Sequence, residues 1–312
     1  MFTKGCGFVL EIIKASDGRE IYLNKWLPEG EVRAVVVLLH GMAEHSGRYA
    51  EFAQYLNEAG IALYCHDQRG HGLTGQAAGD LGHLIPHWGW HMMVDDGCRI
   101  LQLAKAEWEV PVYLMGHSMG SFLARVLTQQ NPHLMAGLIL SGTGSNPQAM
   151  VKTGRQTAAV MCRLQGAEHP SPLLQNITFG AFNSKFKNHK TAYDWICRDE
   201  EVVQAYIDDG FCGLTCTNGF YYELYDVNLT ANQLANDKRL PSQLPILIFS
   251  GDHDPVGDMG EGVRKVCANY RALGIEDVTC RLYPGGRHEM LNELNKAEVF
   301  ADVRQWLLDH LA

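Results

Sequence analysis

Three residue types that support nucleophilic catalysis occur along the chain in the order serine, aspartate and histidine. Ser118 lies in the segment Gly-His-Ser-Met-Gly (116–120), which follows an apolar run and precedes a run with helical periodicity. This context is typical of a nucleophile on a sharp strand-to-helix turn, where side chains at Gly116 or Gly120 would not fit. The same segment could be an ordinary turn between two core elements, so Ser118 needs partners before it predicts chemistry.

Candidate partners for Ser118 occur near the end of the chain. His288 follows an apolar run and the glycine pair 285–286, so we expect its loop to project over the edge of a sheet. An imidazole in this position could accept the serine proton, and a carboxylate on its other nitrogen would orient it. Asp254 is our choice for that carboxylate, whereas Asp252 would cap or brace the turn. The sequence therefore predicts a triad of Ser118, Asp254 and His288.

An acyl-transfer mechanism also needs N–H groups that stabilise a developing oxyanion. The segment His-Gly-Met (40–42) follows an apolar run, so the backbone N–H of Met42 can lie at the same sheet edge as Ser118. Together with the N–H of Met119, it would form an oxyanion hole. Gly41 would support this arrangement, although it could also be a plain turn residue.

Several other motifs are weaker candidates for a functional site. The segment 66–72 contains two histidines and an aspartate, but we expect a loop braced by its own hydrogen bonds. The segment from His288 lacks the second histidine of a zinc-protease helix, and no P-loop or dinucleotide fingerprint follows a strand. We interpret His117 as a packed neighbour of Ser118. No cofactor and no bound metal are therefore expected.

The bulk properties exclude several classes of protein. The 312 residues are 46% hydrophobic and 20% charged, which is ordinary for a globular protein. The formal net charge of −9 argues against a nucleic-acid partner. Nine scattered cysteines favour free buried thiols over a disulfide framework. The chain shows no signal-peptide pattern and no apolar run near the roughly 18 residues of a membrane helix, so we expect a cytoplasmic protein.

The elements that would position these residues alternate between strands and helices. Runs at 8–15 and 20–27 around a Ser-Asp-Gly turn predict a hairpin. Strands are expected at 34–41, 61–67, 111–118, 136–142 and 278–286, with a strand and its loop at 244–254, and helices at 48–60, 91–108, after Ser118, at 259–273 and at 289–311. This pattern predicts an α/β fold, a mostly parallel twisted sheet with helices on both faces.

The alternation lapses from about 145 to about 240. This segment is polar, aromatic-rich and helix-like, and we interpret it as a cap inserted above the carboxyl edge of the sheet. Ligands bind at that edge in doubly wound sheets. The predicted organisation is an α/β core formed by 1–144 and 241–312, with a helical cap insertion at 145–240.

Taken together, the motifs resemble those of the monoglyceride lipase and lysophospholipase branch of the α/β-hydrolase family. The segments that carry the resemblance, in the order that family shows, are HGMAEHSGRY (40–49), GHG (70–72), GHSMG (116–120), SGDHDPVG (250–257) and RHEMLNE (287–293). The resemblance covers about 30–310. Two departures are Ser121, where such enzymes often have another glycine, and a cap without a strongly apolar lid.

The resemblance implies an α/β-hydrolase fold and a serine hydrolase of monoacylglycerols, lysophospholipids or similar carboxylic esters. By this resemblance Ser118, Asp254 and His288 match the triad, and Met42 and Met119 match the oxyanion positions. We expect an acyl-enzyme on Ser118, a small-molecule acyl ester as the partner, and at most peripheral membrane contact through the cap. The alternatives are an amidase or aminopeptidase on the same triad and a non-catalytic, ligand-binding homologue. Oligomeric state is left open.

Overall fold

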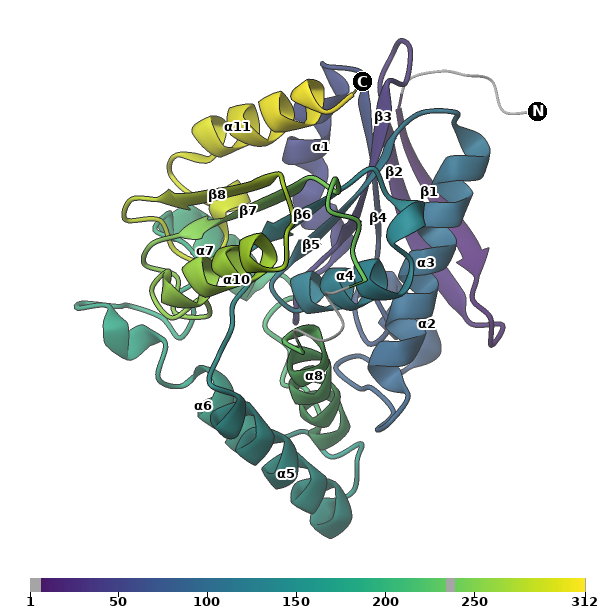
Figure 1. Cartoon of the computed structure of the whole chain (residues 1–312). Coiled ribbons are helices and arrows are strands. Elements are labelled where there is room, and N and C mark those ends of the chain that lie inside the picture. Colours follow the sequence, from purple (N-terminus) through teal and green to yellow (C-terminus); the bar gives the residue numbers. More distant parts are fainter. Residues whose placement is uncertain (1–6, 234–238, 312) are drawn as a thin grey trace.

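The computed structural model describes residues 7–233 and 239–311 (Figure 1). Within these residues an eight-stranded sheet has the strand order β1-β2-β4-β3-β5-β6-β7-β8. The N-terminal hairpin of β1 (Gly7–Lys14) and β2 (Glu20–Leu27) is antiparallel, and β2 also pairs antiparallel with β4 (Ile61–His66). The hairpin predicted from the sequence is therefore confirmed.

The remaining strands are parallel and form the centre of the molecule. They are β3 (Ala34–Leu39), β5 (Val112–His117), β6 (Gly137–Ser141), β7 (Ile246–Gly251) and β8 (Val278–Tyr283). Largely apolar runs suit burial on both faces, and every residue of β3, β4, β5, β6 and β7 is buried, whereas the edge strand β8 is only partly buried. The carboxyl ends of parallel strands share one edge of the sheet, which is where the candidate site residues follow.

Helices cover both faces of the sheet and enclose two apolar cores. One core contains buried side chains of α3 (Gly89–Glu107), α4 (Met119–Gln130) and α10 (Glu261–Ala272). The other contains side chains of α1 (Ala50–Asn57) and α11 (Lys296–Asp309), and Figure 1 shows these two helices side by side. The predicted fold class, a mostly parallel sheet with helices on both faces, is confirmed.

Between β6 and β7 the chain forms a mainly helical segment that projects from the sheet (Figure 1). It contains α5 (Gln148–Gln165), α6 (Pro172–Phe179), α7 (Glu200–Asp208) and α8 (Asn218–Ala231), with a short 3-10 turn, η3 (Asn183–Lys185). Helix α8 runs back to α4, where Arg125 donates to the carbonyl of Ala231 at 2.7 Å. Both α5 and α6 lie farther from the sheet.

Several predicted boundaries differ from the observed ones. The stretch 48–60 contains part of the 3-10 turn η1 (Ser46–Tyr49) followed by α1, and the stretch 289–311 divides into η4 (Met290–Asn292) and α11. Two short elements were not predicted, α2 (Gly72–Ala78) and η2 (Pro132–Leu134). Periodicity cannot separate a helix from the short turns that lead into it, because both place apolar residues three or four positions apart.

The cysteines depart from the expectation that all are free thiols. Cys267 on α10 and Cys280 on β8 form a disulfide, because the packing of this helix on this strand brings two residues 13 positions apart into contact. The other described cysteines are free, and four of them are buried. In the part of the chain that the structure describes, no helix is long and apolar enough to cross a membrane.

Candidate active site

Ser118 occupies a strained turn between β5 and α4. Its φ of 51° and ψ of −120° lie outside the regions that non-glycine residues normally adopt. A Cβ atom on Gly116 would lie 2.3 Å from the carbonyl oxygen of Gly120, and one on Gly120 would lie 2.0 Å from that of Leu39. Both positions therefore require glycine, and the structure places Ser118 on the sharp strand-to-helix turn that the motif predicted.

His288 and Asp254 form a buried pair at the end of two neighbouring strands. The Nδ1–H of His288 donates to the carboxylate of Asp254, with both oxygens at 3.0 Å. Asp254 also accepts hydrogen bonds from the Ser250 hydroxyl at 2.7 Å and from the Val256 N–H at 2.9 Å. Burial alone would raise the pKa of Asp254, but its donors, His288 foremost, lower it. Burial alone would likewise lower the pKa of His288, and the Asp254 charge raises it instead.

Asp252 has a different place from Asp254. Its Oδ1 accepts the N–H of Gly285 at 2.7 Å and the ring N–H of His253 at 2.6 Å. The carboxylate of Asp252 thus braces the turn that precedes His288, whereas the His288 imidazole pairs with Asp254. This arrangement agrees with the preference for Asp254 over Asp252.

A single large cavity brings the remaining predicted site residues together. It has a volume of about 1000 Å³, and its wall includes Gly41, Met42, Ser118, Met119 and His288. Asp254 lies behind His288, fully buried. The opposite wall comes from the segment between β6 and β7 and is mainly apolar and aromatic, with Met150, Val151, Ile177, Phe179, Phe182 and Trp195 among its residues. Most of the cavity wall can therefore accept an apolar ligand.

His117 packs beside the pair of His288 and Asp254. Its ring centroid lies 4.8 Å from that of His288, and its Nδ1 lies 3.1 Å from the Ser141 hydroxyl. Burial, together with the neighbouring His288, lowers the pKa of His117 to about 4. A neutral imidazole here adds no charge next to His288, which suits a packing role.

A buried charge network, missed in the sequence analysis, connects the two sides of the site. Arg48 donates from Nη1 and Nη2 to the two carboxylate oxygens of Glu289, at 2.7 Å each, and from Nη1 to Glu44 at 3.0 Å. The other oxygen of Glu44 accepts the N–H of Gly41 at 2.5 Å. Burial alone would raise the pKa of Glu44, but the Arg48 charge lowers it to about 2. The network thus links the backbone before Met42 to the residue after His288.

Side chains of the segment 66–72 form hydrogen bonds to the loop at 40–48, which carries Met42. The side chain of Asp67 accepts the N–H and the hydroxyl of Ser46 at 2.9 and 2.5 Å. His71 accepts the N–H of Ala43 through Nε2 at 3.1 Å, and burial lowers its pKa to about 3, so the ring is neutral. These bonds brace the loop at 40–48 as well as the segment itself, which goes beyond the self-braced loop that we predicted.

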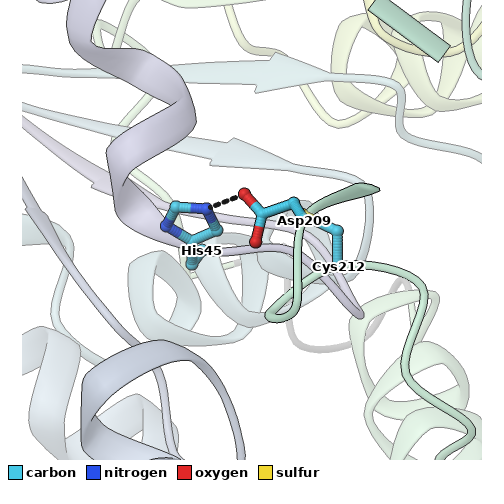
Figure 2. A group of neighbouring side chains, drawn as sticks. All are labelled: His45, Asp209 and Cys212. Carbon is cyan, nitrogen blue, oxygen red and sulfur yellow. Dashed lines mark hydrogen bonds and ion pairs between the residues drawn. The ribbon is translucent and has the colours of Figure 1, made fainter. Parts of the chain in front are cut away.

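One further group of side chains joins this loop to the helical segment (Figure 2). His45, Asp209 and Cys212 place ligand-type atoms within 4.8 Å of one another, close enough to consider a metal ion. However, Nδ1 of His45 accepts the N–H of Gly47 at 3.2 Å, so Nε2 carries the proton that it donates to Asp209 at 2.9 Å. Burial also raises the pKa of the Cys212 thiol. These hydrogen bonds therefore indicate a polar contact between two loops, which we call the clasp of His45 with Asp209.

Several known proteins are similar to this chain over nearly its whole length. A monoacylglycerol lipase from Mycolicibacterium smegmatis is 27% identical over 303 residues, covering 94% of this chain and 95% of the relative. Human monoglyceride lipase is 25% identical over 303 residues, with coverages of 95% and 89%. A thermostable carboxyl esterase from Bacillus coagulans superposes with a TM-score of 0.87 at 26% identity, covering 98% of this chain and 99% of the esterase.

The fold is also shared with more distant solved structures. A soluble variant of monoglyceride lipase from Saccharomyces cerevisiae has a TM-score of 0.77 at 21% identity, with coverages of 99% and 97%. The resemblance inferred from the motifs is therefore confirmed, as is the α/β-hydrolase fold. The model of the family described as serine aminopeptidase, S33, matches residues 30–295, which is most of the chain. The chain belongs to this family.

Proposed function

We propose that this carboxylic ester hydrolase cleaves monoacyl esters, such as monoacylglycerols or lysophospholipids, through an acyl-enzyme on Ser118. The observation that carries the proposal is that strained Ser118 and His288, which Asp254 holds, line one large and mainly apolar cavity. Relatives named monoacylglycerol lipase and carboxyl esterase support an ester as the substrate.

The proposed mechanism assigns one task to each group. Ser118 Oγ attacks the ester carbonyl while His288 accepts its proton, and Asp254 keeps the imidazole in the required tautomer. The backbone N–H groups of Met42 and Met119 stabilise the oxyanion, a contribution of about 3 kcal/mol per donor in such sites. His288 then returns the proton to the leaving alcohol, and water hydrolyses the acyl-enzyme through the same groups.

We further propose that residues 145–240 act as a cap over a core formed by 1–144 and 241–312. In this arrangement α5 and α6 supply the apolar wall that holds the acyl chain. Each acyl methylene buried there would contribute about 0.8 kcal/mol of binding free energy. The preferred chain length would therefore report the depth of the cavity.

Peripheral contact of this cap with a lipid surface is part of the same proposal. Large apolar side chains outside the cavity wall are exposed on α5 and α6, namely Val160, Leu164 and Leu173. They contrast with the expectation of a cap without a strongly apolar lid, since sequence composition does not show which apolar residues face outward. The cytoplasmic location stays a prediction from the sequence.

The family description favours one alternative, an aminopeptidase or amidase on the same triad. An aminopeptidase needs a free carboxylate for the α-ammonium group of its substrate. Glu44 and Glu289 on the cavity wall are both paired with Arg48, whereas Asp258 on the same wall is exposed. The relatives named monoacylglycerol lipase and carboxyl esterase favour the ester substrate.

An activity screen tests the proposal. The purified protein would be assayed with p-nitrophenyl esters of increasing chain length, a monoacylglycerol, a lysophospholipid and aminoacyl p-nitroanilides. We expect hydrolysis of the esters, with a clear optimum of chain length, and little or no cleavage of the anilides. Faster cleavage of the anilides would favour the aminopeptidase, and no hydrolysis of any ester would contradict the proposal.

A further inference from the structure

The outer edge of strand β1 combines features of an interaction surface. In residues 7–233 and 239–311, no strand pairs with this edge. Phe8, Leu10 and Ile12 are 58%, 45% and 50% exposed, which is unusual for three large apolar residues on one strand. We propose that β1 pairs antiparallel with β1 of a second copy of this chain, so that the two sheets become continuous across a two-fold axis.

The hydrogen bonds of the hairpin fix which backbone groups of β1 are available. The N–H of Ala15 donates to the carbonyl of Arg19 at 2.9 Å, and the register with β2 continues without a break to Gly7. Backbone groups of successive residues alternate between the two sides of a strand, so the odd-numbered residues bond to β2. Phe8, Leu10 and Ile12 therefore direct their N–H and C=O groups outward, ready to pair with another strand.

The sequence of β1 is complementary to itself in one specific register. A two-fold axis at Leu10 places Leu10 opposite Leu10 of the second copy and Phe8 opposite its Ile12. All three pairs lie on one face of the sheet, where directly opposed apolar side chains stabilise pairing. Moving the axis to Glu11 would oppose two carboxylates, which is unfavourable. Moving it to Val9 would shorten the paired stretch of β1 from 7–13 to 7–11. In the Leu10 register, Glu11 faces Val9 and keeps its ion pair with Lys25, whose atoms are 2.5 Å apart.

Pairing of β1 with β1 of a second copy is favoured over open-ended association of many copies through their sheet edges. Natural edge strands usually carry protective charges, prolines or bulges. Strand β1 has neither proline nor bulge over Gly7–Lys14. Its charges are Glu11, which shares Lys25 with Glu107, and the exposed Lys14, which lies beyond the stretch 7–13 that pairs in the Leu10 register. Pairing of β1 with itself closes the assembly at two copies, whereas pairing of β1 with the opposite edge strand, β8, would continue without end. The residues of β1 are absent from the wall of the large cavity, so the dimer leaves it open.

Sedimentation velocity on the full chain, over a wide range of micromolar concentrations, tests this proposal. We expect a dimer for the natural chain and monomers for Leu10→Lys and for Leu10→Asp, with the dissociation constant raised at least about tenfold, or about 1.4 kcal/mol. An equal mixture of the two variants should restore a dimer, because residue 10 meets residue 10 of the other copy. Val9→Lys, on the other face and opposite Glu11 of the second copy, should remain dimeric.

Ester hydrolysis and circular dichroism show whether each variant is folded, and the activity should stay unchanged because Leu10 lies outside the cavity wall. The dimer is therefore tested independently of the proposed function. A monomeric natural chain, a dimer that survives Leu10→Lys, a mixture that stays monomeric, or assemblies larger than two copies would each overturn the proposal.

Discussion

Arg48 donates to both carboxylate oxygens of Glu289 at 2.7 Å, and this pair joins the loop that carries Met42 to the residue beside His288. The guanidinium also lies 4.9 Å from the ring centroid of Tyr206, whose hydroxyl donates to the carbonyl of Ala43 at 2.8 Å. Helix α7, which carries Tyr206, belongs to the proposed cap. The Arg48 side chain, which is only 12% exposed, therefore contacts all three parts that must be aligned for the proposed reaction.

Replacing Arg48 with methionine tests this alignment, because it keeps the apolar stem and removes the charge. Two buried carboxylates would lose their partner, and the loops on either side of the site would shift. We expect kcat for a p-nitrophenyl ester to fall by about 100-fold, the scale of a misplacement near 1 Å. Arg264→Met is the matched control, since Arg264 pairs with Glu261 on the exposed surface. Equal activities of the two variants would show that Arg48 does not align the site.

Asp254→Asn changes both the rate and its pH dependence. The charge of Asp254 raises the pKa of His288 above its ordinary 6.5, so kcat/KM of the natural protein should rise with pH through a value above 6.5. Removing the charge lowers that pKa, and the rise should move to lower pH while the rate drops by about 10⁴-fold. A pH–rate profile of both proteins measures this shift. An unchanged midpoint would argue against His288 as the base.

Gly120→Ala should disrupt the turn at Ser118. The added methyl group would lie 2.0 Å from the Leu39 carbonyl oxygen, which is too close for any side-chain adjustment. We expect loss of ester hydrolysis and a decrease of more than about 2 kcal/mol in the free energy of unfolding. Gly30→Ala is the control, because a Cβ there would meet nothing within 4 Å. Chemical denaturation and activity assays of both variants provide the comparison.

Glu223 makes the free energy of unfolding depend on pH. This buried side chain accepts the N–H groups of His87 and Trp90, and burial raises its pKa from 4.5 to about 7. The folded state therefore binds more protons than the unfolded state between these values. This difference in proton binding contributes up to about 3 kcal/mol to the free energy of unfolding. The contribution is fully present below pH 4.5 and is lost as the pH rises through about 7.

Glu223→Gln should remove this contribution, since the amide does not titrate. We expect the unfolding free energy of the variant to change less between pH 5 and pH 8 than that of the natural protein, as urea denaturation would measure. A steeper dependence in the variant would contradict the assignment.

The sequence predicts the strands that surround the site because their signal is local. Runs such as 34–39 and 112–116 are apolar without interruption, as burial on both faces requires. The turn at Ser118 can also be predicted from the local sequence, because the glycines that its tight geometry requires stand at 116 and 120. The brace formed by Asp252 also follows from its place two residues before Asp254.

The remaining features depend on contacts between distant segments. Glu44 and Arg48 stand four residues apart, which alone would suggest a surface pair, and Glu289 lies 241 positions from Arg48. The clasp of His45 with Asp209 spans 164 positions. Neither partner could be chosen before the fold was known. The Cys267–Cys280 disulfide was missed for the same reason, because an odd and scattered set of cysteines does not indicate which two side chains face each other.

The proposed mechanism requires Ser118 to be the nucleophile. Intact-protein and peptide mass spectrometry after reaction with a fluorophosphonate tests this assignment directly, because this probe phosphonylates activated serines. We expect one adduct per chain on the peptide that contains Ser118, no adduct on Ser118→Ala, and ester hydrolysis reduced about a millionfold in that variant. An adduct on another residue, or a Ser118→Ala protein that still hydrolyses esters, would contradict the assignment.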